Sequence, residues 1–187
     1  MKVLTTPHPF LRHTAKPINQ LTAKTIKEIS EMIDTLKQAR DPEGVGLAAT
    51  QVGLDKRIFI LLKPNKEATI FINPQIISTS KLTTSQKYPQ DQDRPLEGCL
   101  SIPRIWGFVD RPYRIKAKYQ TFNPDQSNPA LVSVTKNFEG FRAIAFQHET
   151  DHLNGILFTD HILKQNGTIL KETPSGLQPI KPELLLS

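Results

Sequence analysis

The stretch FQHETDHLNG, residues 146–155, places two histidines four positions apart, with a glutamate directly after the first. Four residues make slightly more than one turn of a helix, so His148 and His152 share one face. Upstream, the same face is apolar and carries Phe141, Ile144 and Ala145. A stripe with this spacing turns toward the protein core. The pattern therefore predicts a helix over about residues 138–154 that presents two imidazoles to the interior.

The segment HETDH within this helix matches the pattern HExxH. In that geometry both histidines bind one metal ion, and the glutamate, here Glu149, reaches the attacking water. Chance predicts about 0.006 matches in a chain of this composition. The alternative interpretation is that two exposed helix histidines lie beside an ordinary surface glutamate. In this pattern such an arrangement is much rarer than a metal site.

Two imidazoles rarely complete a catalytic metal site, so a third ligand is expected elsewhere. The extended pattern HExxHxxGxxH requires a histidine where this chain has Phe158. Glu172 is the best-placed downstream carboxylate, but turn-forming residues flank it. Cys99, in LEGCLSIP at 96–103, is the better donor, because a thiolate and two imidazoles leave a fourth position open. A lone cysteine can equally be a small buried apolar residue, so on the residues alone both alternatives stay open.

The chain has 187 residues, a net charge of +6 and one cysteine. This length favours a single catalytic domain spanning residues 1–187, in which 161–187 form a proline-containing tail of unknown role. The N-terminus lacks the apolar core of a signal peptide, and no run of eighteen apolar residues exists, so we expect a cytoplasmic protein without a membrane span. The basic residues form no dense cluster with interleaved aromatics, which argues against sequence-specific nucleic-acid binding.

An α+β fold is expected, with short mixed or antiparallel strands packed around the C-terminal HExxH helix and an amphipathic helix near the N-terminus. Apolar residues at helical spacing predict that first helix over residues 21–40, ended by Asp41-Pro42. A glycine-rich turn is expected at 44–53 and a polar, exposed loop at 81–95. The expected strands are 57–63, 69–73 with an extension at 76–80, 114–121 and 131–136, of which the last two form a hairpin.

Three segments resemble the signature motifs of the peptide deformylase family, in their usual order. They are GVGLAATQ at 44–51, EGCLS at 97–101 and QHETDHLNG at 147–155. The stretch VLTTPHPFLRHTAKPI near the N-terminus is also similar to the opening of that family. The resemblance spans about residues 3–160. It implies hydrolysis of the N-formyl group from the formylmethionine of nascent polypeptides, with release of formate.

The resemblance also implies a metal site and the groups around it. Cys99, His148 and His152 would bind one divalent metal ion per chain, with Fe²⁺ usual and Zn²⁺, Ni²⁺ or Co²⁺ able to replace it. Glu149 would carry the proton, while the side-chain amide of Gln51 and the backbone N–H of Leu100 would stabilise the oxyanion. The implied peptide-binding residues are Gly44, Val45, Gly46, Glu97, Gly98, Phe141, Ile144 and Ala145. Glu97 would also orient the loop that carries the cysteine.

Three positions depart from the family pattern. Thr50 stands where proline is frequent, Thr150 where an apolar residue is usual, and Trp106 near a position that is often arginine. None is an implied ligand or proton carrier, so the departures bear on pocket shape and peptide preference.

Two other functions compete with the implied one. The first is a zinc endopeptidase with Glu172 as third ligand, and the second is a catalytically silent relative that binds nascent chains or ribosomes. Intact ligands, Gln51 and Glu149 argue against the silent relative. Direct ribosome contact has only the positive net charge as independent support.

Overall fold

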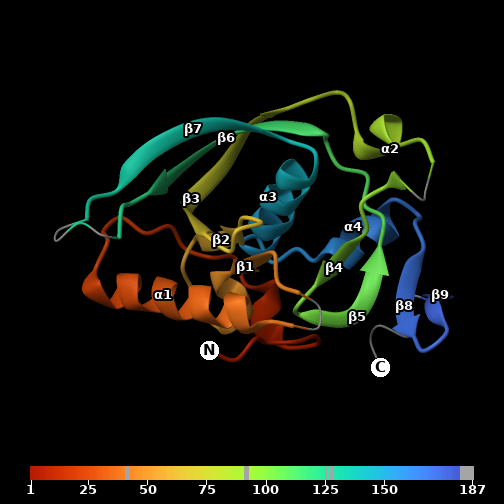
Figure 1. Cartoon of the computed structure of the whole chain (residues 1–187), viewed down its shortest axis with the longest axis horizontal. Coiled ribbons are helices and arrows are strands. Elements are labelled where there is room, and N and C mark those ends of the chain that lie inside the picture. The colour runs from red at the N-terminus through yellow and green to blue at the C-terminus, as the bar shows by residue number, and fades with distance from the viewer. Residues whose placement is uncertain (41–42, 91–92, 125, 127–128, 182–187) are drawn as a thin grey trace.

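The computed structural model describes residues 1–40, 43–90, 93–124, 126 and 129–181 (Figure 1). The helices of this part of the chain are η1 (Pro9–Arg12), α1 (Ala23–Gln38), η2 (Ala49–Val52), α2 (Thr84–Lys87), α3 (Phe141–His152) and α4 (Phe158–Lys164). Its strands are β1 (Gly46–Ala48), β2 (Ile58–Leu62), β3 (Ala68–Thr79), β4 (Glu97–Cys99), β5 (Ile102–Gly107), β6 (Arg114–Thr121), β7 (Val132–Glu139), β8 (Ile169–Thr173) and β9 (Gly176–Ile180). The expected α+β fold, with antiparallel sheets around the HExxH helix, is confirmed. None of the described helices combines the length and the apolar character needed to cross a membrane.

The larger sheet is antiparallel, with the strand order β1-β2-β3-β6-β7. Strands β6 and β7 form the hairpin that the sequence predicts, paired from Arg114–Glu139 to Thr121–Val132. The segments expected at 69–73 and 76–80 belong to one strand, β3, which continues through Pro74 with a shift of register. A proline cannot donate to the sheet ladder, and a bulge is one of the places where a strand tolerates it.

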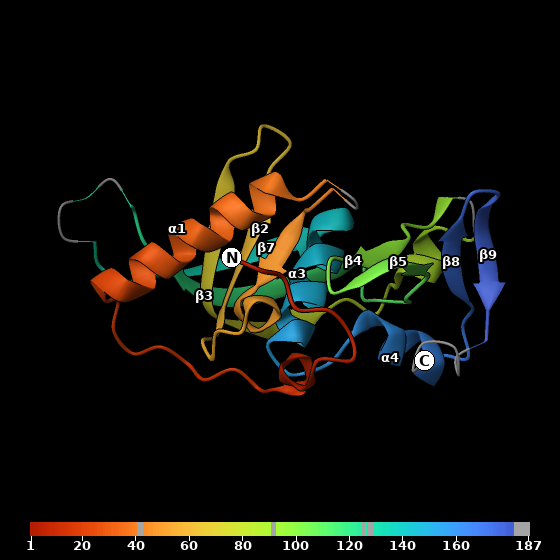
Figure 2. The same ribbon diagram turned by 90° about the horizontal axis from the view of Figure 1, so that it is seen from below.

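Helices α1 and α3 cover opposite faces of the larger sheet (Figures 1 and 2). Along β2, Ile58 and Ile60 pack in the cluster that includes α1, whereas Phe59 and Leu61 pack in the cluster that includes α3. Successive side chains of a strand point to opposite faces, so a strand buried on both sides is apolar throughout. The predicted first helix is confirmed within two residues at each end, and it begins after Thr22, whose hydroxyl accepts a hydrogen bond from the N–H of Thr25 at 3.1 Å.

The smaller sheet, β4-β5-β8-β9, lies on the other side of α3 from the larger one (Figure 2). Its core is a separate cluster to which Cys99 itself belongs, together with Leu11, Ile105, Phe158 and Ile162. Strands β8 and β9 come from the proline-containing tail. Pro179 is placed in β9, the edge strand, where its missing N–H is tolerated.

Three local expectations were wrong. Residues 44–53 are not simply a turn, because Gly46 pairs with Leu61 of β2 and a 3-10 helix follows. The HExxH helix begins at Phe141 rather than near 138, because the preceding residues remain paired with β6 as part of β7. The segment 81–95 contains α2, and Thr84 is buried with its hydroxyl donating to the carbonyl of Val109. Asp41 and Pro42, the expected stop signal after α1, lie outside the described residues.

Candidate metal centre

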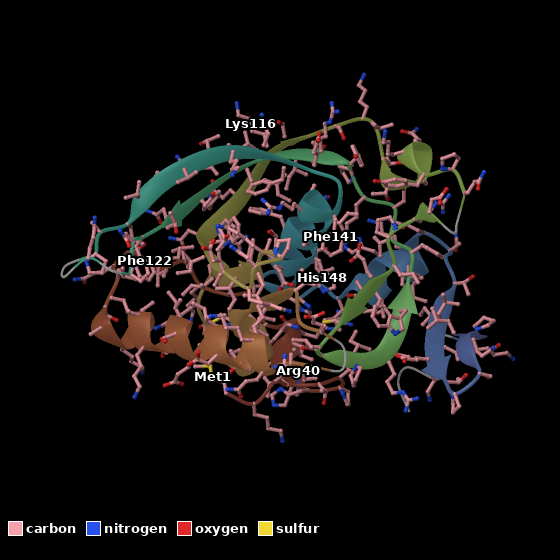
Figure 3. The ribbon with its side chains drawn as sticks, in the orientation of Figure 1. Met1, Arg40, Lys116, Phe122, Phe141 and His148 are labelled. Carbon is pink, nitrogen blue, oxygen red and sulfur yellow. The ribbon has the colours of Figure 1, made fainter. Side chains whose placement is uncertain are left out.

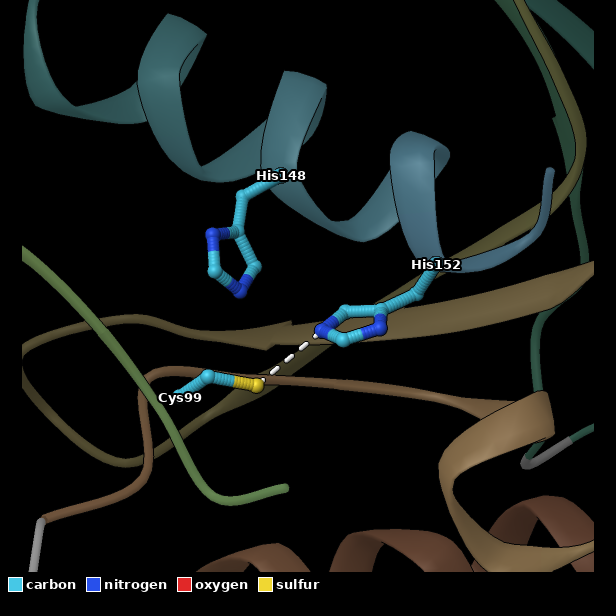
Figure 4. A group of neighbouring side chains, drawn as sticks. All are labelled: Cys99, His148 and His152. Atoms are coloured by element: carbon cyan, nitrogen blue, oxygen red, sulfur yellow. Dashed lines mark hydrogen bonds between the residues drawn. The ribbon is translucent and has the colours of Figure 1, made fainter. Parts of the chain in front are cut away.

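Three buried side chains converge at the positions that the sequence predicts for metal ligands (Figure 4). His148 and His152 come from successive turns of α3, and Cys99 comes from the end of β4 in the smaller sheet. Their donor atoms all lie within 4.8 Å of one another, and Sγ of Cys99 lies 3.1 Å from Nε2 of His152. The helix therefore supplies one pair of ligands, and the smaller sheet supplies the third.

The sulfur of Cys99 is surrounded by N–H donors. The backbone N–H of Ser101 and the side-chain amide of Gln51 each donate to Sγ at 3.4 Å. Gln51 is buried, and its Oε1 accepts a hydrogen bond from the N–H of Ala48 at 2.8 Å. This second bond fixes the amide orientation, so that the NH₂ group faces the cysteine. Gln51 thus connects the glycine-rich segment to the ligand.

A buried ion-pair network holds His148 from behind. Nδ1 of His148 lies 2.8 Å from Glu97, so its other ring nitrogen turns toward Cys99 and His152 (Figure 4). Glu97 also accepts two hydrogen bonds from Arg111, which donates a further one to Asp151 at 2.8 Å. Burial disfavours the carboxylate, but attraction to Arg111 and hydrogen bonds with His148 and Arg111 hold the pKa of Glu97 at about 2. The imidazole is therefore oriented by a carboxylate that stays ionised.

Within the described part of the chain, no carboxylate is hydrogen-bonded to the ring of His152. Its backbone carbonyl accepts a hydrogen bond from the hydroxyl of Thr50 at 3.0 Å, and its ring Nδ1 is buried without a hydrogen-bond partner. Burial, together with repulsion from His148 and Arg111, lowers the pKa of His152 well below its ordinary value. A neutral imidazole is the form that binds a metal ion.

Glu149 lies in the interior beside the ligands. A Cβ atom at position 46 would come within 2.3 Å of Oε1 of Glu149, so Gly46 provides the space that the carboxyl group occupies. Oε2 is buried and has no hydrogen-bond partner among the described residues. Burial raises the pKa of Glu149 to about 7, with His148 opposing the rise and Glu97 adding to it. A carboxyl group with this pKa takes up and releases a proton readily near neutral pH.

The residues present fit a divalent transition metal. One sulfur and two imidazole donors within 4.8 Å are a set that such ions accept. Burial opposes protonation of His148, yet hydrogen bonds with Cys99 and Glu97 raise its pKa well above the ordinary value. Oε2 of Glu149 is buried without a partner among the described residues, so it would be available to a water molecule at the ion.

The ligands open into a cleft of about 220 Å³ that we call the β1–β4 cleft, because edge strands of the two sheets, β1 and β4, form its walls. Residues of α3, among them Phe141 and His148, line it from a third side (Figure 3). All the residues implied as catalytic or peptide-binding line this cleft: Gly44, Val45, Gly46, Gln51, Glu97, Gly98, Leu100, Phe141, Ile144, Ala145 and Glu149. A larger cavity of about 670 Å³ adjoins it beyond Val45 and Phe141, but none of the three metal ligands lines that cavity.

Sequence reasoning missed Arg111 and Asp151. Asp151 lies within the HExxH segment, and its position next to His152 was the one sequence feature that pointed to a role at the site. Arg111 follows β5 in a segment without a recognisable pattern, yet it is 4% exposed and joins β4 to α3. The structure does not bring Glu172 to the histidines. That carboxylate lies on β8 and accepts a hydrogen bond from Nε1 of Trp106 at 3.3 Å.

Comparisons with known proteins match the chain over most of its length. A family model described as polypeptide deformylase matches residues 1–167. A peptide deformylase of Halothermothrix orenii is 41% identical over 157 residues, which are 83% of this chain and 89% of that protein. The crystal structure of peptide deformylase from Thermotoga maritima has a TM-score of 0.70 and 36% identity, covering 86% of this chain and 95% of that one. A Met-Ala-Ser bound crystal structure of class I type b peptide deformylase from Acinetobacter baumannii has a TM-score of 0.69 and 31% identity, covering 87% of this chain and 98% of that one.

Proposed function

The chain belongs to the polypeptide deformylase family, and on this premise we propose that Cys99, His148 and His152 bind its catalytic metal ion. It is a hydrolase that removes the formyl group from the N-terminus of nascent polypeptides, and the family implies a divalent metal. The observation that carries the ligand assignment is the convergence of three buried donor atoms beside Glu149. We assign one ion per chain, Fe²⁺, with Zn²⁺, Ni²⁺ and Co²⁺ as substitutes that the same donor set accepts.

Glu149 is the proposed proton carrier. When bound, the divalent ion supplies a Lewis acid that lowers the pKa of water and polarises a carbonyl group. Glu149 accepts a proton from the attacking water, since its carboxyl group lines the cleft and its pKa lies near 7. It then gives that proton to the departing amine of the methionine, and formate leaves. None of the described residues donates a hydrogen bond to Oε2, so this oxygen is available for the transfer.

Gln51 and Leu100 are the proposed oxyanion donors. Attack at the formyl carbon moves negative charge onto the formyl oxygen, which then needs donors already in place. The amide nitrogen of Gln51 lies 3.4 Å from Sγ of Cys99 and 3.1 Å from Oγ of Ser101, so its N–H groups are directed toward the ligand region. The backbone N–H of Leu100, directly after the cysteine, is the second donor. Loss of one such donor typically costs about 3 kcal/mol of transition-state stabilisation.

The peptide is proposed to bind in an extended form along the β1–β4 cleft. Both walls are edge strands, which can form main-chain hydrogen bonds with an added strand. Gly44, Gly46 and Gly98 shape these walls, because a Cβ atom there would come within 2.6 Å of Leu36, Glu149 and Trp106, respectively. The methionine side chain would enter the apolar part of the cleft, beside Val45, Phe141, Ile144 and Ala145. The Met-Ala-Ser bound to the Acinetobacter baumannii relative is the peptide that formyl-Met-Ala-Ser would leave after this reaction.

The cellular setting belongs to the same proposal. We place the enzyme in the cytoplasm, as a single catalytic domain that acts on formylmethionyl chains during synthesis. Contact with the ribosome would bring it close to that substrate, and the net charge of +6 supports an attraction to an RNA-rich particle.

The first test is formate release from formyl-Met-Ala-Ser by protein purified without oxygen, with the metal content assayed in the same sample. We expect formate together with about one metal ion per chain. Fully metallated protein that releases no formate would refute the proposed roles. Cys99→Ala tests the competing peptidase, because a site completed by Glu172 would keep its metal in that variant.

Glu149→Gln tests the proton route. The amide keeps the shape of the carboxyl group but cannot carry the proton, so we expect turnover to fall by about 10²-fold or more. Metal content should stay unchanged, since Glu149 is not a proposed ligand. The measurements are formate release and metal content on the same preparations. Turnover that survives the substitution would eliminate Glu149 as the proton carrier.

A further inference from the structure

The larger cavity, which we call the sheet cavity, lies between the larger sheet and the start of α3, and the proposed reaction does not use it. Its volume is about 670 Å³, and none of the three metal ligands lines it. Strands β2, β3, β6 and β7 supply much of its wall through Leu61, Leu62, Thr69, Phe71, Tyr119, Lys136 and Phe138. Small-molecule sites commonly have this size and a largely apolar lining. The sheet cavity is therefore a candidate site for a ligand other than the peptide.

Three aromatic rings form the apolar floor of the sheet cavity. Phe71, Tyr119 and Phe138 are 2%, 7% and 8% exposed, respectively. The ring of Phe71 is inclined by 56° to Tyr119 and by 63° to Phe138. Rings inclined in this way offer no flat slot in which a planar ligand could stack on two of them. A flexible acyl chain can follow such a surface, so the floor favours an acyl chain over an aromatic body.

The rim of the sheet cavity is basic. Four cationic side chains line it: Lys63, Lys66, Lys136 and Arg142. Among the described residues Glu43 is the one acidic residue that lines it, and it pairs with Lys66. Lys63 pairs with a second glutamate just outside. Within the described part of the chain, Lys136 and Arg142 form no ion pair with a carboxylate. The rim therefore favours a ligand that carries a negative charge.

The two unpaired cations lie beside the floor and at the start of α3. The Nζ atom of Lys136 is 6.0 Å from the centre of the Phe138 ring. Arg142 is the second residue of α3, a helix with no side-chain hydrogen bond at its N-cap and no acidic residue in its first turn. A helix N-terminus carries partial positive charge, which an arginine there increases. A carboxylate between Lys136 and Arg142 would offset this excess while its chain covered the rings.

The sheet cavity and the β1–β4 cleft share part of their walls. Val45, Phe141 and Ala145 line both of them. Val45 is 39% exposed and Phe141 is 53% exposed, so each offers apolar surface to a ligand. These side chains are also the ones proposed to contact the methionine of the substrate. Because two ligands cannot cover the same surface at once, an occupant that reaches Val45 and Phe141 weakens the binding of the formylated peptide.

We propose that the sheet cavity binds a fatty-acid-like carboxylate and that this ligand competes with the formylated peptide. The acyl chain lies on Phe71, Tyr119 and Phe138, and the carboxylate lies between Lys136 and Arg142. The competition rests on the proposed function, because it takes the β1–β4 cleft as the peptide site. Binding in the sheet cavity does not depend on that function and is measured separately.

Calorimetric titration of the metal-loaded enzyme tests the charge of the ligand. Octanoate should bind about 3- to 10-fold more tightly than octanol, the range expected for one or two partly exposed ion pairs, and octyltrimethylammonium should bind most weakly. The double variant Lys136→Gln/Arg142→Gln should lose the preference for octanoate. Lys116→Gln is the matched control, since Lys116 is an exposed lysine of the adjacent strand β6 that does not line the cavity (Figure 3). Equal affinity for the three probes, or an unchanged preference in the double variant, would overturn the proposal.

The same titration tests the shape of the ligand. Hexanoate, which is shorter than octanoate by two methylene groups, should bind about 5- to 15-fold more weakly if both groups are buried. Naphthoate, which is planar and carries the same charge, should bind less tightly than octanoate. Tighter binding of naphthoate would contradict an acyl site.

Thr69→Phe tests the location. Thr69 of β3 lines the sheet cavity but not the β1–β4 cleft, so a phenylalanine there fills the cavity and leaves the metal centre as it is. Octanoate should no longer bind, while KM for formyl-Met-Ala-Ser should stay unchanged. Octanoate bound through the metal ion would bind this variant as tightly as the wild type, and that result would overturn the site. Far-UV circular dichroism checks the fold, and Thr69→Leu replaces Thr69→Phe if the latter is unfolded.

Kinetics test the competition. Octanoate should raise KM for formyl-Met-Ala-Ser without changing kcat in the wild type, and it should have no effect on Thr69→Phe. An unchanged KM at octanoate concentrations that saturate the calorimetric signal would overturn the competition. Absence of formate from every preparation would overturn the proposed function instead, and calorimetry would still decide whether the sheet cavity binds the carboxylate.

Discussion

The two halves of the molecule hold the metal ligands in different ways. Both histidines lie on α3, which packs on the larger sheet through stacked and edge-on aromatic rings that include Phe59, Phe71 and Phe146. Behind that sheet lies a further layer, α1. Cys99 belongs instead to the smaller cluster, which draws residues from η1, β5, α4 and β8. The site exists only while these halves keep their relative position, so the smaller half should control metal affinity most directly.

Arg111→Met removes the ion pairs that connect the two halves. It should have the largest effect on stability and on metal affinity. Arg111 is 5% exposed in its side chain and joins Glu97 of β4 to Asp151 of α3. Its removal leaves the buried carboxylate of Glu97 without its guanidinium partner, at a cost of about 3–5 kcal/mol in the free energy of unfolding. Because Glu97 also orients His148, metal affinity should fall about 10- to 100-fold. Urea unfolding and metal titration measure the two effects.

The control is Arg114→Met, which breaks an ion pair with Glu139 in which both side chains are 65% exposed. That change should cost less than about 1 kcal/mol. Equal losses in the two variants would show that Arg111 does not join the halves.

A matched pair of cavity variants separates stability from metal binding. Ile162, from the smaller cluster, and Ile58, from the α1 cluster, are both fully buried, so truncation of either to alanine should cost about 2–5 kcal/mol. Only Ile162→Ala loosens the cluster that contains Cys99, and it alone should weaken Co²⁺ binding. Urea unfolding gives the first quantity, and the cobalt–thiolate absorption band gives the second. Equal loss of cobalt affinity in both variants would contradict a separate role for the smaller half.

Asp160→Asn probes a contact at the edge of the smaller half and should have the smallest effect. Burial raises the pKa of Asp160, but hydrogen bonds from Arg12 and from the N–H of Leu157 hold it below its ordinary value of 3.8. A lowered folded-state pKa means that the carboxylate stabilises the fold above pH 3.8 and loses this effect as pH falls through the folded-state pKa. Since the side chains of both partners are more than a third exposed, the gain is a few tenths of a kcal/mol. The melting temperatures of the two proteins should differ at pH 7, and the difference should shrink as the pH is lowered below 3.8.

Elements with a strong local period were predictable, and elements that depend on distant pairing were not. The apolar stripe of α1 and the alternation of β6 appear directly in the sequence and agree with the structure. Strand β4 has three residues and takes its strand character from pairing with β5, so no local pattern marks it. Strands β8 and β9 contain or adjoin glycine and proline, which favour turns in isolation, and they form by pairing with β5 and with each other.

The sequence by itself determined that one helix presents two imidazoles and a glutamate to the interior, because helix geometry fixes side chains four residues apart on one face. The family motifs pointed to Cys99 and Gln51, and the residues alone left Glu172 open as a ligand. Only the tertiary structure placed the cysteine sulfur beside His152, 53 residues away, and Glu172 beside Trp106, 66 residues away. Contacts over such separations depend on how sheets and helices pack, and no local period of the chain encodes that packing.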